Sequence, residues 1–170
     1  MSEKIWIISD THFNHTNIIR YCARPYISTE EMNKDLIKRW NNIVRPQDTV
    51  YHLGDFGMGN KREITEWRCA LNGRIKLIRG THDGRSNQWY RDCGFDEVYD
   101  HSILIQDFYI LSHEPLSVMP HYPFANIFGH IHNSGELPDF GKNFYNACVE
   151  VNNYTPILFE DIKKSMGRIK

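Results

Sequence analysis

The stretch KIWIISD, residues 4–10, is a continuous apolar run that ends in a carboxylate. An unbroken run of this length is typical of a strand that is buried on both faces. Similar runs recur in TVYHLGD at residues 49–55 and in RIKLIRG at residues 74–80. The three runs predict buried strands, each of which ends at polar residues.

Two helices are expected between these strands. In residues 28–44, Ser28 and Glu31 fit a capping box. The apolar residues that recur at helical spacing along this segment are Met32, Leu36, Ile37, Trp40, Ile43 and Val44. Residues 61–73 repeat the pattern, with Gly73 as the expected C-cap. The alternation of strand and helix indicates an α/β class for this half of the chain.

The chain after about residue 96 has a different pattern. Strands are expected within residues 97–113, 125–132 and 145–151, and a closing helix is expected within residues 155–167. Short polar or proline-bearing turns join the strands, which suits a second sheet of mixed or antiparallel pairing. We therefore expect one α/β domain over residues 1–170, with two sheets packed face to face and helices outside.

Composition excludes several classes of protein. Lys and Arg number 20 against 21 Asp and Glu, so the net charge of −1 predicts no general attraction to nucleic acid or to an anionic bilayer. No stretch reaches the roughly 18 apolar residues of a membrane span, and we expect a cytoplasmic protein. The cysteines are widely separated, which favours neither a disulfide framework nor a thiolate zinc site.

Polar residues with metal-binding side chains gather at the ends of the apolar runs. They are Asp10, His12, Asp55, His82, Asp83, His113, His130 and His132. In α/β sheets such ends converge on one edge, where ligands bind. Residues at i and i+2 on extended chain project to the same side, so Asp10 with His12, and His130 with His132, can each supply two ligands to one pocket.

Carboxylates and imidazoles without a thiolate suit borderline divalent ions, Mn²⁺ first, with Zn²⁺, Fe²⁺, Ni²⁺ and Co²⁺ as alternatives. One tetrahedral ion needs about four ligands, so the surplus favours two ions that share a carboxylate, an arrangement used for in-line attack on phosphorus. Asp55 lies between the two sets in chain order and is the candidate bridge. A structural or surface role is expected for His15, His52, His101 and His121.

Asp83 has two interpretations. Asp-Gly is a favoured turn pair, so Asp83 could be the turn residue before Gly84. Its carboxylate could instead orient His82 and hold that imidazole protonated.

The motifs SDTH, GDFG, GTHD, LSHEP and GHIH, in this order and at these intervals, resemble the five signature blocks of the calcineurin-like metallophosphoesterases. The resemblance spans residues 5 to about 157 and includes VEVNNYTPI, which is similar to the small bacterial and phage phosphoesterases of that superfamily. It implies a four-layer αββα sandwich of two mixed sheets flanked by helices. The metallo-β-lactamase pattern fits worse, because it needs H-x-H-x-D-H and His132 is followed by Asn133.

The resemblance also implies roles for individual residues. For the first ion it implies the ligands Asp10, His12, Asp55 and His132. For the second ion it implies Asp55, His113 and His130, together with residue 81. His82 matches the histidine that neutralises or protonates the leaving oxygen, with Asp83 as its partner.

Thr81 departs from the family pattern, in which an asparagine at this position donates its carbonyl oxygen to the second ion. A neutral hydroxyl one bond nearer the backbone is a poorer ligand, so the affinity for the second ion should fall. Three explanations stay open: drift tolerated because the other ligands hold the ion, a site that works with one tight ion, or a change engineered to slow turnover.

The expected function is hydrolysis of phosphate esters by a metal-activated hydroxide. Little sequence remains for a cap domain, so we expect an open site that favours phosphodiesters, including nucleotide or nucleic-acid-derived substrates. A phosphomonoesterase is the alternative within the same class. A catalytically weakened binding module is the alternative from another class; the presence of His82 counts against it and Thr81 counts modestly for it. The sequence predicts no oligomeric state.

Overall fold

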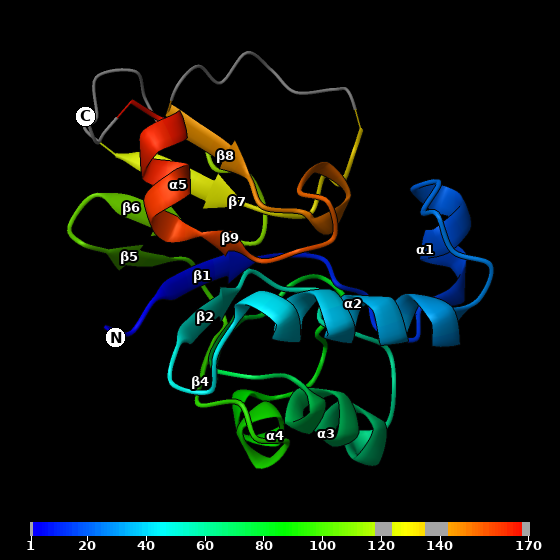
Figure 1. The fold of residues 1–170 in the computed structure, drawn as a ribbon. Coiled ribbons are helices and arrows are strands. Elements are labelled where there is room, and N and C mark those ends of the chain that lie inside the picture. The colour runs from blue at the N-terminus through cyan, green and yellow to red at the C-terminus, as the bar shows by residue number, and fades with distance from the viewer. Residues whose placement is uncertain (1, 118–123, 135–142, 168–170) are drawn as a thin grey trace.

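The computed structural model describes residues 2–117, 124–134 and 143–167 (Figure 1). Within these ranges the chain forms two mixed β-sheets that face each other and are flanked by helices. The predicted class, an α/β sandwich of two sheets with helices outside, is confirmed.

The first sheet has five strands in the order β4-β3-β2-β1-β9. The strands are β1 (Ile5–Ile8), β2 (Thr49–His52), β3 (Arg74–Ile78), β4 (Glu97–Tyr99) and β9 (Ile157–Leu158). The neighbours from β1 to β4 pair in parallel, and β9 pairs antiparallel with β1. The carboxyl ends of β1, β2 and β3 therefore meet at one edge of the sheet.

The second sheet has four strands in the order β5-β6-β7-β8. They are β5 (Ile103–Ile105), β6 (Tyr109–Leu111), β7 (Ala125–Phe128) and β8 (Phe144–Asn146). Strands β5 and β6 are antiparallel, whereas β6, β7 and β8 run parallel. The loops that follow β6 and β7 consequently leave the sheet at the same edge.

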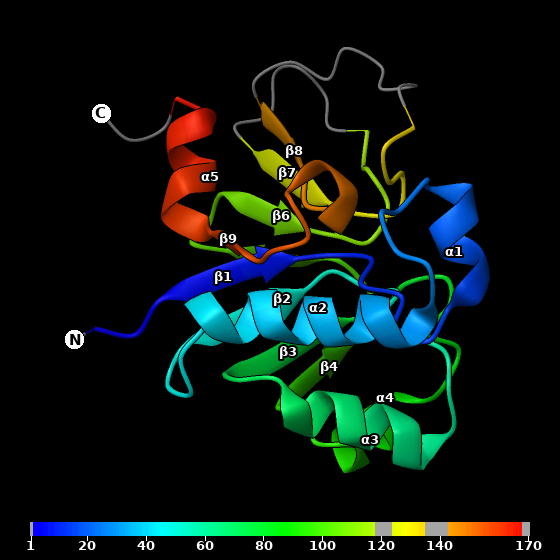
Figure 2. The ribbon, with the colours of Figure 1, turned by 45° about the vertical axis from the view of Figure 1, so that its right-hand side comes forward.

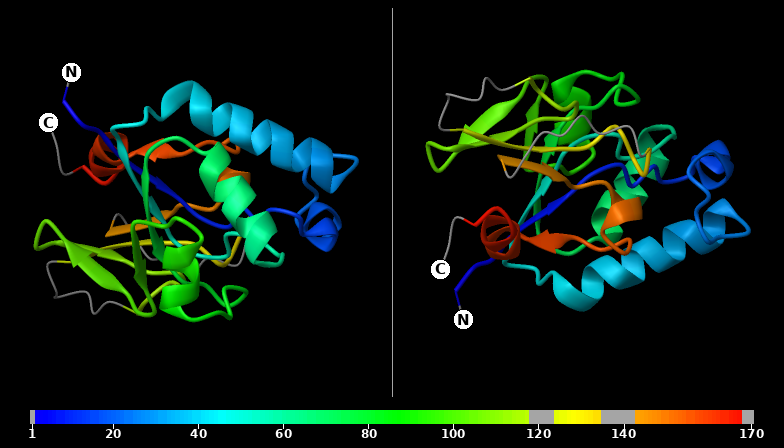
Figure 3. Two further views of the ribbon diagram at one scale, coloured as in Figure 1. Left: turned by 90° about the horizontal axis from the view of Figure 1, so that it is seen from below. Right: turned by 90° about the horizontal axis from the view of Figure 1, so that it is seen from above.

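Helices cover the first sheet on the side away from the second sheet (Figures 1 and 2). The helical segments of the whole described chain are α1 (Thr16–Tyr21), α2 (Thr29–Ile43), α3 (Lys61–Ala70), α4 (Asn87–Asp92), the 3-10 turn η2 (Val149–Val151) and α5 (Phe159–Ser165). Of these, α5 lies on the face of the first sheet that is turned toward the second sheet, next to β1 and β9 (Figure 3). None of the helices in the described ranges has the length and apolar character that crossing a bilayer requires.

Two apolar cores lie on the two faces of the first sheet, because successive strand residues point to opposite faces. Ile8 packs with the helix-side core, which includes Leu36 and Trp40 of α2. Ile7 packs with the core between the sheets, to which α5 contributes Phe159. The unbroken apolar run of β1 is needed because both of its faces are buried.

Helix α2 begins where the sequence predicts. The Ser28 side chain accepts a hydrogen bond from the Glu31 backbone N–H at 3.2 Å. The Glu31 carboxylate, however, accepts from the Ile27 N–H at 2.8 Å, so the reciprocal bond is one residue earlier than in a capping box. Helix α3 ends before Gly73, and its C-cap is Leu71, whose side chain turns into the core. The prediction that Gly73 caps this helix is therefore wrong.

Two predicted strands in the second half also differ from the structure. Residues 97–99 belong to the first sheet, where they pair with β3. The segment 145–151 is extended only to Asn146; Cys148 then bridges Ser9 beyond β1, and a 3-10 turn follows. Local pattern cannot reveal which sheet a strand joins, because the pairing partners are distant in sequence. The short helices α1 and α4 were not predicted, since six residues carry little periodic signal.

Truncation of the α2 face tests the helix-side core. Leu36 is 2% exposed and packs in that core. We expect Leu36→Ala to lower the free energy of unfolding by about 2–5 kcal/mol, because it removes buried methyl groups and leaves a cavity. Lys38→Ala on the exposed face of the same helix should change it by no more than about 0.5 kcal/mol. Urea denaturation measures both, and equal effects would contradict the packing of α2.

Candidate metal centre

The sequence-predicted site residues lie just beyond strand ends at one edge of the sandwich. Asp10 follows β1, Asp55 follows β2 and His82 follows β3. From the second sheet, His113 follows β6 and His130 follows β7. Because the two sheets pack face to face, the loops at this edge of both sheets come together.

The backbone at this edge is left-handed at five of the predicted ligands, which are Asp10, His12, Asp55, His130 and His132, with φ from 50° to 70°. A non-glycine residue in this region costs on the order of 1–3 kcal/mol, although Asp and His tolerate it better than most. Backbone bonds hold the bends: the Asp10 N–H donates to Gly54 and the His12 N–H donates to Asp55, both at 3.0 Å. The fold thus fixes where these side chains point.

A first cluster consists of Asp10, His12 and His132. Asp10 Oδ1 lies 3.7 Å from the Nε2 atoms of both His12 and His132. Among the described residues, Asp10 Oδ1 and His12 Nε2 are buried and have no hydrogen-bond partner. Burial opposes ionisation of Asp10, but the nearby imidazoles of His12, His132 and His113 bring its pKa below the usual range.

A second cluster consists of Asp55, His113 and His130. Asp55 Oδ2 lies 3.5 Å from His113 Nε2, and His113 Nε2 lies 3.1 Å from His130 Nδ1. The same Asp55 Oδ2 is 3.6 Å from His12 Nε2 in the first cluster. One carboxylate oxygen therefore faces both groups.

These residues fit divalent metal ions. With a metal–ligand bond of about 2.1 Å, neighbouring ligand atoms lie roughly 3.0–3.5 Å apart, which is close to the spacings in both clusters. Without an ion, Asp10 Oδ1 and His12 Nε2 stay buried without a hydrogen-bond partner, which costs free energy. A mixture of carboxylate oxygen and imidazole nitrogen suits borderline ions. The geometry thus supports divalent cations without identifying the element.

Hydrogen bonds to the second ring nitrogens orient two of the histidines. His113 Nδ1 donates to the Leu53 carbonyl at 2.9 Å. His132 Nδ1 donates to Glu150 Oε1 at 3.0 Å. In each ring the other nitrogen, Nε2, faces the cluster, where a metal ion would use its lone pair.

Glu150 and Arg24 form a buried support that the sequence pattern does not predict. Glu150 Oε1 accepts from Arg24 Nε at 2.9 Å and Nη2 at 2.6 Å. Arg24 also donates to the carbonyls of Asp10 and Thr11. Burial opposes ionisation of Glu150, but His132 and Arg24 lower its pKa. A charged residue between two valines in an apolar run was the only signal in the sequence.

Asp83 does not lie against His82, so the expected pairing is wrong. Its two carboxylate oxygens accept from the backbone N–H groups of Asp55 at 2.7 Å, Phe56 at 3.2 Å and Gly80 at 2.9 Å. The Asp83 side chain is 1% exposed, and burial raises its pKa to about 6. Asp83 therefore holds together the loops after β2 and β3 and fixes Asp55.

His82 is the open member of the site, since its side chain is 44% exposed. Its backbone N–H donates to Asp55 Oδ1 at 2.7 Å, and its Nε2 lies 4.0 Å from Asp55 Oδ2. The imidazole faces the rings of His12 and His15 at centroid distances of 5.2 and 5.6 Å. A proton carried by His82 can thus reach a group bound beside Asp55.

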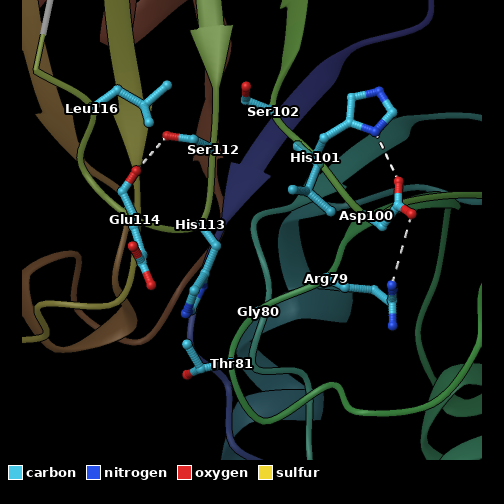
Figure 4. Close-up of a pocket in the computed structure, with 11 residues that line it drawn as sticks. Arg79, Gly80, Thr81, Asp100, His101, Ser102, Ser112, His113, Glu114 and Leu116 are labelled. Atoms are coloured by element: carbon cyan, nitrogen blue, oxygen red, sulfur yellow. Dashed lines mark hydrogen bonds and ion pairs between the residues drawn. The ribbon is translucent and has the colours of Figure 1, made fainter.

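Thr81 lies beside the second cluster, next to His113 (Figure 4). Its hydroxyl donates to Asp55 Oδ2 at 3.4 Å. A cavity of about 300 Å³ opens here. Its lining residues are Ile78, Arg79, Gly80, Thr81, Asp100, His101, Ser102, Ser112, His113, Glu114 and Leu116. The side of the site at Thr81 is therefore accessible to a ligand.

Two motif glycines allow the loops to approach closely. A Cβ atom on Gly80 would overlap Asp55 Oδ1, and one on Gly129 would overlap Ser9 Oγ and Asp10 Oδ2. Any side chain at either position would displace a carboxylate of the site. The glycines before Thr81 and His130 are required by this contact.

The remaining histidines divide into three cases. His52 is buried, hydrogen-bonds with the Thr11 hydroxyl at 2.9 Å and has its pKa lowered by burial to about 3, so it is structural as expected. His101 is exposed beside Asp100, and His121 lies outside the described residues. His15 was expected to have only a structural or surface role, but its Nδ1 lies 3.1 Å from His12 Nδ1, beside the first cluster.

Comparison with known proteins agrees with the fold and the motifs. The family model of the calcineurin-like phosphoesterases matches residues 3–164. An uncharacterized protein of Methanocaldococcus jannaschii, MJ1445, is 39% identical and the match covers 98% of this chain and 93% of that protein. The gene 66 protein of Mycobacterium phage L5 is 36% identical over 46% of this chain and 39% of its own length.

Two solved structures are also similar. The protein of unknown function AQ665 from Aquifex aeolicus superposes with a TM-score of 0.75 at 30% identity, over 96% of this chain and 99% of that one. The Pseudomonas putida nuclease MPE superposes with a TM-score of 0.50 at 20% identity, over 75% of this chain and 61% of that one. The sequence motifs, the two-sheet sandwich and the family match together show that this chain belongs to the calcineurin-like phosphoesterase family.

Proposed function

We propose that this chain is a phosphodiesterase that works with two divalent ions, Mn²⁺ being the first choice among Mn²⁺, Zn²⁺, Fe²⁺, Ni²⁺ and Co²⁺. The observation that carries the proposal is the position of Asp55 Oδ2, 3.6 Å from His12 Nε2 and 3.5 Å from His113 Nε2. A carboxylate oxygen between two ligand clusters suits a shared ligand of a two-ion centre.

The chain's own residues have distinct roles in this proposal. The first ion would be held by Asp10, His12, Asp55 and His132, and the second by Asp55, His113 and His130, with Thr81 as a weak additional contact. Two ions bound there would supply Lewis acidity toward the phosphoryl group and lower the pKa of an attacking water. His82 would protonate or neutralise the leaving oxygen. Asp83 keeps Asp55 in place through the backbone.

Two cavities favour a diester over a monoester. The loop of residues 80–84 contributes Thr81 to a cavity of about 300 Å³ that His113 also lines, and contributes His82 and Gly84 to one of about 360 Å³. A phosphodiester carries a substituent on each side of phosphorus, and each cavity can take one. A monoester would leave one of them without a role.

A weakened binding module is the second candidate, and Thr81 is the observation that favours it. In that case the fold would serve to bind another protein and would not hydrolyse phosphate esters. The test is hydrolysis of bis-p-nitrophenyl phosphate and p-nitrophenyl phosphate with added Mn²⁺, together with metal analysis. Faster cleavage of the diester supports the proposal, faster cleavage of the monoester supports a monoesterase, and cleavage of neither supports the binding module.

Asp55→Asn tests the shared ligand. We expect loss of at least half of the bound metal and a fall in diester hydrolysis of at least 100-fold. The reason is that an amide is a weaker ligand than a carboxylate and that residue 55 faces both clusters. Metal analysis and initial rates measure this. Asp107→Asn, an exposed substitution in the turn between β5 and β6, should change neither. Full metal content in Asp55→Asn would exclude the bridging role.

His82→Ala separates acid catalysis from metal binding. Its turnover should fall by about 100- to 10,000-fold, the range for loss of a general acid, while the metal content stays at the wild-type value. The reason is that the His82 side chain is 44% exposed and belongs to neither ligand cluster. Loss of metal in this variant, measured by elemental analysis, would assign His82 to the ligands instead.

Thr81→Asn restores the carbonyl oxygen that the family pattern has at this position. We expect a higher affinity for the second ion and a higher turnover, because Thr81 already lies beside Asp55 and His113 but reaches less far. Titration with Mn²⁺ and measurement of rates at each concentration resolve the two sites. Identical titrations and rates for the two proteins would show that residue 81 does not contact the ion.

A further inference from the structure

A second cavity lies beside His82 and shares no lining residue with the pocket of Figure 4. It has a volume of about 360 Å³, at the small end of the range for ligand sites. Gly57, Gly59 and Gly84 contribute backbone without side chains to its wall, and Trp89 contributes an aromatic ring. The cavity therefore offers open backbone and an aromatic face, and His82, whose ring faces that of His12, connects it to the metal centre.

Trp89 is a fixed platform in this cavity. Its backbone N–H donates to the Ser86 hydroxyl at 3.2 Å, at the start of α4. Its ring meets the Tyr90 ring edge to face, with centroids 4.9 Å apart, and packs against the helix-side core. Because neighbours hold the indole in place, a ligand that stacks on it does not have to order it first.

Arg85 gives the cavity its charge. Its guanidinium carbon lies 5.8 Å from the centre of the Trp89 ring, and the residue is exposed. The backbone that carries it is fixed, since Arg79 Nη1 donates to the Arg85 carbonyl. The planar guanidinium can stack on a ring or pair with a phosphate, so this wall of the cavity attracts a flat and negatively charged ligand.

We propose that this cavity binds the leaving group of the substrate and that this leaving group is a nucleotide, with its base on Trp89 and its phosphate near Arg85. The assignment to the leaving group rests on the proposed function, because His82 lines the cavity and would protonate the oxygen that departs. A base has a π-face for the indole, and a nucleotide also carries the negative charge that Arg85 attracts. The local positive charge of Arg85 supplies the attraction for an anionic ligand that the net charge of −1 does not.

The experiment compares AMP with ribose 5-phosphate, which differs only in lacking the base. Binding of each to the Mn²⁺-loaded protein is measured by calorimetry, so no turnover is needed. AMP should bind about 5- to 150-fold more tightly than ribose 5-phosphate, the range expected for stacking of one base. Trp89→Ala should abolish this difference while leaving the binding of ribose 5-phosphate unchanged.

Two further variants make the result specific. Arg85→Ala alters an exposed side chain, so it should fold normally and weaken AMP binding by at least 3-fold. Tyr21→Ala is the matched control. The Arg20 guanidinium carbon lies 5.6 Å from the centre of the exposed Tyr21 ring, a similar pairing, but neither residue lines either of the two cavities. It should bind AMP as the wild type does. Equal affinities of AMP and ribose 5-phosphate in the wild type, or a base preference that survives Trp89→Ala, would overturn the proposal.

Hydrolysis of bis-p-nitrophenyl phosphate, measured in parallel, reports on the proposed function separately. A Trp89-dependent preference for AMP without metal-dependent hydrolysis would leave the nucleotide site standing and reject the phosphodiesterase together with the leaving-group role. Hydrolysis without a base preference would keep the phosphodiesterase and reject the nucleotide site.

Discussion

The position of the Asp55 carboxylate is the constraint on which the rest of the site depends. One of its oxygens faces ligand atoms of both clusters, and the other accepts the His82 backbone N–H. This placement needs Asp83 to bind the backbone of the Asp55 loop and needs Gly80 to have no side chain. The GTHD motif therefore serves the carboxylate of the neighbouring strand as much as its own histidine.

The sandwich provides the rigidity that this placement requires. Five candidate ligands have a left-handed backbone, which persists only where surrounding structure determines it. Backbone bonds from Asp10 to Gly54 and from His12 to Asp55 couple the loops after β1 and β2. The Gly129 N–H, which donates to the His113 carbonyl at 2.8 Å, couples the loops after β6 and β7. Each pair of loops extends strands that contribute to the buried cores, so the strain at the ligands is offset by packing below them.

The sequence predicts the parts of this molecule that rest on local pattern. The runs that became β1, β2 and β3, the helix α2 and the gathering of ligands at strand ends follow from apolar periodicity and from the geometry of parallel sheets. It does not predict what depends on distant partners. The contact of Arg24 with Glu150 joins residues 126 apart in the chain, and the membership of β4 in the first sheet depends on pairing with β3. Asp83 shows the same limit at short range, because adjacent residues in a turn can point in opposite directions.

The two clusters are unequally supported, and this asymmetry bears on how the centre works. In the first, His132 is backed by a buried Glu150 that Arg24 holds, and Asp10 and His12 are almost fully buried. In the second, Thr81 offers only a hydroxyl, which lies 3.4 Å from the Asp55 carboxylate. A preorganised and desolvated site binds a cation more tightly than one with fewer fixed donors. In the proposed two-ion centre, the first ion would therefore be held more tightly than the second. Because the second cluster borders the open cavity at Thr81, the more weakly held ion would lie on the side from which a ligand can enter.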